Sequence, residues 1–333
     1  MDADLDSLVD EYANKVFPTT ATYYMAASLG ALGNIIVLLV YIFRIKRQVH
    51  RYYIPVLAVV DFTGCVNNVV FFHFLDSHQY DYPSDALCRC ISFLVIFNNG
   101  VSGHVILVIA LQRYMMLCRP FAKQLNGGMR RASLLIVSAL ALFYGLPTFY
   151  ASGTSNQTLN YGNKTYNTTT CSFVSHVSSK NNFQKGYFGF LLAMILLNIF
   201  ITAGLYIPVL KRVYHSFARL EETSFPEEVP VNDEGEVMGG SRSSSRARMK
   251  HNMSLTVFCI IIVYIISFLP SLLTQTMALK EPSIADTAVH MNLYHFFARF
   301  YVFNHIVNPF IYIGFDVKFR KEITFLVTSF RRK

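Results

Sequence analysis

The sequence has no tryptophan and few charged residues. Only 15 % of its 333 residues are Asp, Glu, Lys or Arg, whereas 53 % are hydrophobic. Because soluble domains average about 25 % charged residues, this composition excludes an ordinary soluble protein and predicts a membrane protein. The six cysteines lack the spacing of metal ligands, so no zinc or haem site is expected.

Three further absences narrow the possible classes of protein. Met1 is followed by Asp2, Asp4 and Asp6 instead of a basic segment, so no cleavable signal peptide is expected. The catalytic motifs His-x-x-Glu-His and Gly-x-Ser-x-Gly do not occur, and the chain is therefore not expected to be an enzyme. Cys259 is the last cysteine, which excludes a palmitoyl anchor on the C-terminal segment.

The apolar residues form seven long runs. A transmembrane helix needs about 20 mostly apolar residues, and it satisfies its own backbone hydrogen bonds inside the bilayer. The runs are 22–43, 53–75, 91–117, 132–150, 186–210, 253–279 and 289–315. We therefore expect seven transmembrane helices, which place the two chain termini on opposite sides of the membrane.

The net charge of +9 comes from short basic clusters beside the apolar runs, and not from a nucleic-acid-binding surface. The loops on the side of the C-terminus hold 22 of the 29 Lys and Arg residues, and the loops on the other side hold 7. Because basic loops stay in the cytoplasm, we expect a multi-pass plasma-membrane protein with an extracellular N-terminus and a cytoplasmic C-terminus.

Three N-glycosylation sequons support this orientation. They begin at Asn156, Asn163 and Asn167, and all three fall in the loop between the fourth and fifth runs. Glycosylated sequons lie on surface loops of secreted segments. The charge distribution independently places this loop outside the cell.

The segments outside the spans have compositions of their own. Residues 1–21 are acidic and are expected to form an extracellular tail before the membrane domain at 22–315. Residues 216–251, rich in Glu, Ser, Gly and Arg, predict a disordered cytoplasmic loop. Residues 316–333 alternate basic and apolar side chains, which predicts an amphipathic helix on membrane lipid and a short cytoplasmic tail.

Short motifs then occur one per apolar run, in a fixed order. They are Gly33-Asn34, Leu57-Ala58-Val59-Val60-Asp61, Gln112-Arg113-Tyr114, Tyr206, Phe268-Leu269-Pro270 and Asn308-Pro309-Phe310-Ile311-Tyr312. Cys88 lies 25 residues before Arg113. Together these features resemble a rhodopsin-like (class A) G-protein-coupled receptor. The resemblance implies an all-α membrane protein, a seven-transmembrane helix bundle with a short amphipathic eighth helix.

Several positions depart from the family pattern and indicate a divergent member. The usual fourth-helix tryptophan is missing, and Phe268 replaces the tryptophan of the sixth helix. Asn198 stands where the fifth helix usually has a proline. Gln112 replaces the acid that normally neighbours Arg113, which predicts a weaker inactive-state latch and raised basal signalling.

The resemblance assigns roles to residues inside the bundle. It implies a buried sodium pocket lined by Asp61, Ser102, Asn304 and Asn308, with Asn98 as a further candidate. Oxygen ligands suit such a hard cation, and an unpaired buried carboxylate is costly. The alternative is a water-filled polar cluster that packs the helices together.

A second set of residues is expected to switch the bundle between states. In the family, the arginine at Arg113 moves toward Tyr206 and Tyr312 on activation, although it could instead be an ordinary interface arginine. Proline removes a helical hydrogen bond and permits a kink, so Pro270 and Pro309 are candidate pivots. The predicted switch residues are Gln112, Arg113, Tyr114, Tyr206, Phe268, Pro270, Pro309 and Tyr312.

On the outer side, the resemblance implies a disulfide between Cys88 and Cys171 that holds the glycosylated loop over the third helix. Cys90 remains an alternative partner, although the spacing to Arg113 favours Cys88. Arg299 could bind an acidic group of a ligand or extend to the membrane interface. The candidate ligand-binding residues are His73, Asn99, Gln275, His295, Arg299 and Tyr301.

Two ligand classes are excluded by the aligned positions. Val95 replaces the acid of amine receptors, and Val302 replaces the lysine that binds retinal in opsins. The long glycosylated loop, tyrosine-rich rim and acidic tail resemble neuropeptide receptors, which implies a peptide ligand, a heterotrimeric G protein and arrestin as partners. A chemosensory receptor for a small molecule and a seven-span transporter are the alternatives.

Overall fold

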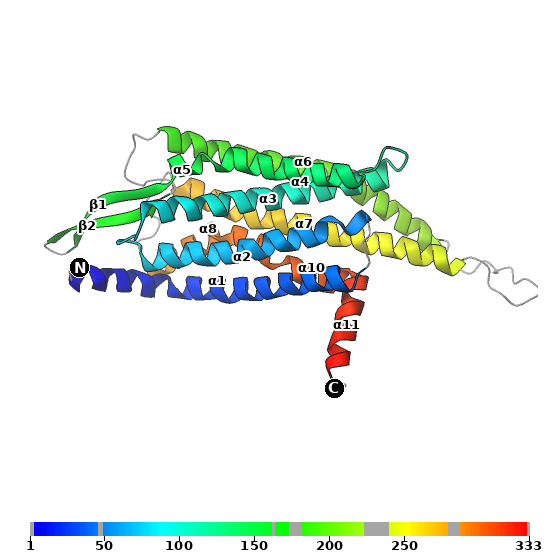
Figure 1. The fold of residues 1–333 in the computed structure, drawn as a ribbon, viewed down its shortest axis with the longest axis horizontal. Helices are drawn as coiled ribbons and strands as arrows, with labels where there is room; N and C mark the ends of the chain where they lie inside the picture. The colour runs from blue at the N-terminus through cyan, green and yellow to red at the C-terminus, as the bar shows by residue number, and fades with distance from the viewer. Residues whose placement is uncertain are drawn as a thin grey trace, which may run out of the picture.

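The protein is a bundle of long helices with a small sheet at one end (Figure 1). The computed structural model describes residues 3–45, 49–161, 164–172, 182–222, 240–278 and 287–331. Six helices are long and apolar enough to cross a membrane. They are α1 (Ala3–Phe43), α2 (Tyr53–Ser77), α3 (Asp85–Cys118), α4 (Gly127–Gly145, continued by α5, Thr148–Ala151), α6 (Asn182–Glu222) and α7 (Gly240–Ala278).

The seventh span is assembled from short pieces instead of one helix. It consists of α8 (Ala288–Ala298), the 3₁₀ turn η3 (Phe300–Val302), α9 (Phe303–Ile306) and α10 (Asn308–Phe315). Pro309 lies in the first turn of α10. Backbone N–H groups there have no partner within the helix, so the missing N–H of proline costs no helical hydrogen bond. With this span, the predicted seven-helix membrane bundle is confirmed, and the apolar run 289–315 turns out to be interrupted.

Helix α1 is longer than its apolar run. It begins at Ala3 and contains 41 residues, which corresponds to a length of about 60 Å. The segment before residue 22, which its composition suggested as a tail, is therefore helical from Ala3. It is also packed, because the Tyr12 hydroxyl lies 3.1 Å from Nε2 of His295 and the Thr19 hydroxyl donates to Oδ1 of Asn292 at 2.6 Å.

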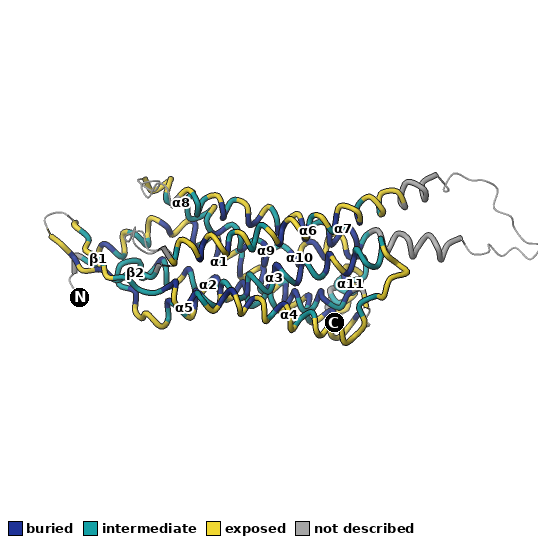
Figure 2. The backbone as a smooth tube through the Cα atoms, turned by 90° about the horizontal axis from the view of Figure 1, so that it is seen from above, coloured by how far each residue is buried: buried dark blue, intermediate teal, exposed yellow. Residues whose placement is uncertain are grey.

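Apolar side chains cover both the interior and the outer surface of the bundle. Buried and exposed residues alternate along most of the long helices (Figure 2). Among the exposed side chains are Leu135 and Phe200, which are 73 % and 71 % exposed. So large an apolar surface would be unstable in water and is what a bilayer requires.

The amphipathic helix predicted at the C-terminal end is confirmed as α11 (Val317–Arg331), which stands at a steep angle to the bundle (Figure 1). Asp316 fixes this corner, because its Oδ1 accepts the backbone N–H groups of Lys318 and Phe319 at 3.0 and 3.2 Å. Its Oδ2 accepts Nη1 of Arg51 at 2.5 Å and the Tyr41 hydroxyl at 2.6 Å. The start of α11 is therefore tied to α1 and to the turn η1 (Val49–Arg51).

The region expected as a disordered cytoplasmic loop is partly helical. Helix α6 continues to Glu222 and α7 begins at Gly240, so both enter the range 216–251 that composition suggested as disordered. Residues 223–239 lie outside the described part of the chain. Polar helix extensions of this kind lack the apolar periodicity from which a span is recognised in sequence.

At the other end of the bundle, β1 (Gly153–Tyr161) and β2 (Lys164–Ser172) form an antiparallel hairpin. The register pairs Asn156 with Thr169 and Thr158 with Asn167. On its other side β2 meets the connection between α2 and α3, because the Thr169 N–H donates to the carbonyl of Tyr80 and its carbonyl accepts the N–H of Tyr82, both at 2.8 Å. The two sequon residues Asn156 and Asn167 are exposed, and Asn163 lies outside the described residues.

The predicted disulfide is also confirmed. Cys88 and Cys171 are bonded, with their Cα atoms 5.7 Å apart, and join the start of α3 to the end of β2. Cys90, the alternative partner, is exposed and unbonded. The hairpin is thus attached to the bundle by one covalent bond and by the strand pairing with residues 80–82.

We predict that Cys171→Ser destabilises the end of the bundle that carries the hairpin, because the cross-link between two residues 83 positions apart is lost. Removing a native disulfide costs about 2–5 kcal/mol, so cell-surface expression should fall strongly. Flow cytometry of an N-terminally tagged chain measures this, with Cys90→Ser as the matched control that keeps normal expression. Equal damage from both substitutions would contradict the assigned pairing.

Candidate functional site

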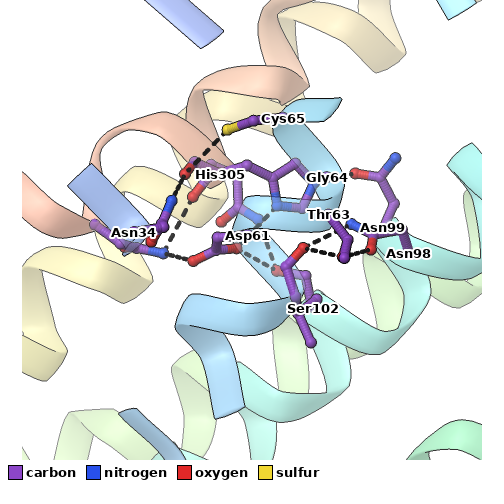
Figure 3. Close-up of polar contacts among 12 residues, drawn as sticks. Asn34, Asp61, Thr63, Gly64, Cys65, Asn98, Asn99, Ser102 and His305 are labelled. Carbon is purple, nitrogen blue, oxygen red and sulfur yellow. Dashed lines mark hydrogen bonds and ion pairs between the residues drawn. The ribbon is translucent and has the colours of Figure 1, made fainter. Parts of the chain in front are cut away.

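A polar network lies in the middle of the bundle, around Asp61 of α2 (Figure 3). Asp61 is fully buried. Its Oδ2 accepts the side-chain amide of Asn308 at 2.6 Å, and its Oδ1 accepts the Ser102 hydroxyl at 3.4 Å. Asn304 donates in turn to Ser102 at 3.0 Å. Four of the five residues predicted for a sodium pocket therefore meet here, from α2, α3 and the broken seventh span.

The fifth predicted residue, Asn98, lies beside this network and has other partners. Its amide nitrogen donates to the carbonyl of Val60 at 3.1 Å, and its oxygen accepts the Thr63 hydroxyl at 2.7 Å. Both contacts join α3 to α2. Within the described residues, Asn98 therefore acts as a link between helices, one turn before Ser102 on α3.

His305 is the central residue that sequence reasoning missed. Its Nδ1 lies 2.9 Å from Oδ1 of Asp61, and its Nε2 lies 3.1 Å from Oδ1 of Asn99. The side chain has no solvent exposure. A polar ring inside an apolar run is costly in a membrane and marks a functional position, so the same rule that singled out Asp61 could have found it.

The arrangement around Asp61 does not fit a sodium ion. Hard cations are held by several oxygen atoms, whereas both carboxylate oxygens of Asp61 already face nitrogen atoms, from His305 and Asn308. The network instead satisfies a buried carboxylate with protein donors alone.

Three of the predicted switch residues, Gln112, Arg113 and Tyr312, meet at the end of the bundle away from the hairpin. Gln112 and Arg113 are only 3 % and 5 % exposed, and the Gln112 amide donates to the carbonyl of Val49 at 2.9 Å. With Tyr312 and Met253 they border a cavity of about 10 Å³, which has room for one water molecule at most. This end is closed, because the arginine lies inside the protein.

The other switch residues do not line this cavity. The Tyr206 hydroxyl donates to the carbonyl of Ser254 and so joins α6 to α7. The Phe268 ring lies 6.2 Å from that of Tyr301, which connects α7 to the seventh span. Tyr114 is half-buried at the edge of the core.

Arg299 adopts neither of the two roles that its position suggested. Its guanidinium forms a two-point ion pair with Asp76 of α2, with nitrogen–oxygen distances of 2.5 and 2.8 Å. The charge also lies 4.4 Å above the ring of Phe72, and the Thr20 hydroxyl donates to the same carboxylate. The side chain is 3 % exposed. Arg299 thus holds α1, α2 and the seventh span together.

The remaining candidate ligand-binding residues do not converge on one open site. The Tyr301 hydroxyl donates to Oδ1 of Asn68 at 2.7 Å, and His295 contacts Tyr12 and Arg299. Like Asn99, these two side chains lie within contacts between helices. His73 is exposed on the outer surface of α2, and Gln275 is half-buried on α7.

Comparison with known proteins identifies the family. The model of the family described as 7 transmembrane receptor (rhodopsin family) matches residues 33–312, which is most of the chain. The chain belongs to the rhodopsin family of seven-transmembrane receptors. Members of this family are not enzymes, and the Cys88–Cys171 bond is the disulfide expected of the family.

Individual relatives are distant. The receptor is 27 % identical over 123 residues to C5a anaphylatoxin chemotactic receptor 1 of the gorilla, covering 36 % of this chain and 35 % of that relative. It is 31 % identical over 140 residues to the human substance-K receptor, covering 41 % and 35 %. With cephalotocin receptor 2 of Octopus vulgaris it shares 22 % over 299 residues, covering 87 % and 67 %. The matches to the gorilla and human relatives span about a third of their length.

We predict that Asp76→Ala strongly destabilises the receptor, because it leaves the Arg299 charge buried without its carboxylate. Breaking a buried pair costs about 3–5 kcal/mol. Thermal unfolding of the purified receptor in detergent measures the effect. Glu11→Ala, in a Lys15–Glu11 pair whose side chains are 46 % exposed, is the control and should cost about 0–1 kcal/mol.

The double replacement Asp76→Leu with Arg299→Met extends this test. Apolar side chains of similar volume often replace a buried ion pair without loss of stability, so the double variant should recover most of the unfolding midpoint. If Asp76→Ala unfolds at the same temperature as Glu11→Ala, the ion pair does not hold these helices together.

Proposed function

We propose that this receptor binds an extracellular peptide at the end that carries the hairpin and activates a heterotrimeric G protein at the opposite end. The proposal places the receptor in the plasma membrane with its N-terminus outside. The 22-to-7 distribution of Lys and Arg between the two sets of loops supports this orientation. The family supports the G protein as partner.

The hairpin is the observation that carries the peptide proposal. It projects past the helix ends beside the N-terminus of α1 (Figure 1). Strand β2 is paired on both sides, with β1 and with residues 80–82, whereas no described strand pairs with the far side of β1. An extended peptide can add itself to an open strand edge through main-chain hydrogen bonds.

The interior of the same end offers less to a small ligand. Asp76 pairs with Arg299, Tyr301 with Asn68, and His295 with Tyr12. These buried polar groups are satisfied by one another, so a small molecule would have to break existing bonds to use them. This arrangement favours recognition at the surface over recognition deep in the bundle.

The names of the relatives point the same way. Those relatives are receptors named for C5a anaphylatoxin, substance K and cephalotocin, which are peptide ligands. Because their sequence identity to this chain is low, these relatives support the class of ligand and not its identity. A neuropeptide is the proposed subclass, as the acidic N-terminal segment and the tyrosine-rich rim suggest.

Activation of a G protein requires the closed end to open. Arg113 is buried and must leave the interior to meet a partner. The hydrogen bond from Tyr206 to the Ser254 carbonyl joins α6 to α7 and would have to break or shift when these helices separate. Pro270 interrupts the hydrogen bonding of α7, and Pro309 lies in the first turn of α10. We propose these two prolines as the hinges of that movement.

A ligand screen tests the proposed function. Cells that express the receptor are exposed to a peptide library and to a library of small metabolites, with calcium and cyclic-AMP as readouts. We expect peptide hits whose signal is lost in Arg113→Ala at equal surface expression. Hits from metabolites alone would overturn the peptide proposal, and substrate uptake into vesicles without nucleotide exchange would overturn the receptor mechanism.

We also predict that Gln112→Glu lowers ligand-independent signalling. Glutamate would give Arg113 a neighbouring carboxylate, and a difference of about 1 kcal/mol changes a two-state ratio about five-fold. Nucleotide exchange on a purified G protein measures basal activity. Gln112→Met, which removes the donor to Val49 without adding charge, should not lower it; equal activity of the wild type and Gln112→Glu would contradict the prediction.

A further inference from the structure

We propose that His305 takes the place of a bound sodium ion, so that the pocket around Asp61 excludes sodium and the receptor is insensitive to it. The observation behind this proposal is that an imidazole ring, supplied by the seventh span, lies against the carboxylate where a cation would otherwise be needed. The inference does not depend on which ligand the receptor binds.

The hydrogen bonds show that the carboxylate is already neutralised. The Asn99 amide nitrogen donates to the carbonyl of Val95 at 2.9 Å, which turns the Asn99 oxygen toward Nε2 of His305. Nε2 must therefore donate to Asn99. A hydrogen must then also lie between Nδ1 of His305 and Oδ1 of Asp61, whichever atom carries it. The pair holds a proton in the position of a counter-ion.

The chain also makes room for the ring. A Cβ atom added at Gly64, one turn after Asp61 on α2, would lie 2.7 Å from Cγ and 2.8 Å from Cδ2 of His305, and also 2.7 Å from Nδ2 of Asn98. Such distances are well inside van der Waals contact. The absence of a side chain at Gly64 is therefore what allows the imidazole to reach Asp61, and this feature is independent of the hydrogen bonds.

The oxygens that sodium would need are nevertheless nearby. Within the described residues, Oδ1 of Asn304 and Oδ1 of Asn308 are buried and accept no hydrogen bond. Together with Asp61 and Ser102 they form the set of oxygen donors that a hard cation prefers. Histidine is the member of the cluster that can offer no oxygen. Replacing it with a small residue should therefore create a sodium site.

An ion and a side chain differ in one respect that matters for switching. Sodium dissociates and its occupancy follows its concentration, whereas His305 is covalently part of α9 and is always present. The contact between α2 and the seventh span can then be broken only by moving the helices apart. In this receptor the state of the pocket therefore depends on the positions of the helices alone, and not on the sodium concentration.

Thermal unfolding of the purified full-length receptor tests the proposal without ligand or G protein. Sodium replaces potassium at constant ionic strength, and the unfolding midpoint is followed as sodium rises. The wild type should show no sodium-specific change. His305→Ser should gain a saturable increase of about 2–4 °C, and adding Asp61→Asn to that variant should abolish it.

A second comparison tests whether the ring fills the pocket. Gly64→Ala should lower the midpoint of the wild type, because the new methyl group overlaps both the imidazole and the Asn98 amide. It should cost less in a His305→Ser background, where only the overlap with Asn98 remains. Equal losses in the two backgrounds would contradict the assigned position of the ring.

The outcomes separate cleanly. A saturable, sodium-specific stabilisation of the wild type overturns the proposal. So does a folded His305→Ser variant that remains insensitive to sodium, because His305 would then not be what excludes the ion. If that variant cannot be purified, ²³Na relaxation of the wild-type receptor decides: broadening that potassium does not compete away overturns the proposal, and its absence supports it.

Discussion

A helix that is broken inside a bilayer must find partners for its polar groups within the protein, because no water reaches them. The seventh span of this receptor is broken in this way, and buried charges hold its pieces in place. Arg299, after α8, pairs with Asp76. His305 of α9 contacts Asp61. Asp316, after α10, pairs with Arg51. All three contacts reach α2 or the turn before it, so α2 determines where the seventh span lies.

The membrane fold could be predicted because its signals are local. Long apolar runs, basic clusters at their ends and the spacing from Cys88 to Arg113 are all read within one segment at a time. The Asp61 cluster followed from the cost of a charge in hydrocarbon together with motif order. In each case the hydrophobicity or charge that a membrane requires can be recognised from neighbouring residues, so no knowledge of distant contacts was needed.

The features that were missed depend on which residues face each other across the bundle. His305 lies 244 positions from Asp61, and Arg299 lies 223 from Asp76. No periodicity relates such positions, so the sequence suggested that Arg299 binds a ligand or extends to the membrane interface. The hairpin and the helical start of α1 were hidden for a related reason. Their sequences are polar, and packing against residues 80–82 and α8 supplies the order that composition does not suggest.

The length of α1 has a consequence for how a partner meets the receptor. In the proposed orientation, about 20 residues back from Phe43 cross the hydrocarbon and end near Tyr24, an aromatic residue of the type that favours the membrane interface. The preceding residues therefore stand outside the bilayer as an ordered helix. Fixing a disordered segment on binding would cost about 1–2 kcal/mol of backbone entropy per residue. Here that loss has already occurred on folding, so association with α1 need not include it.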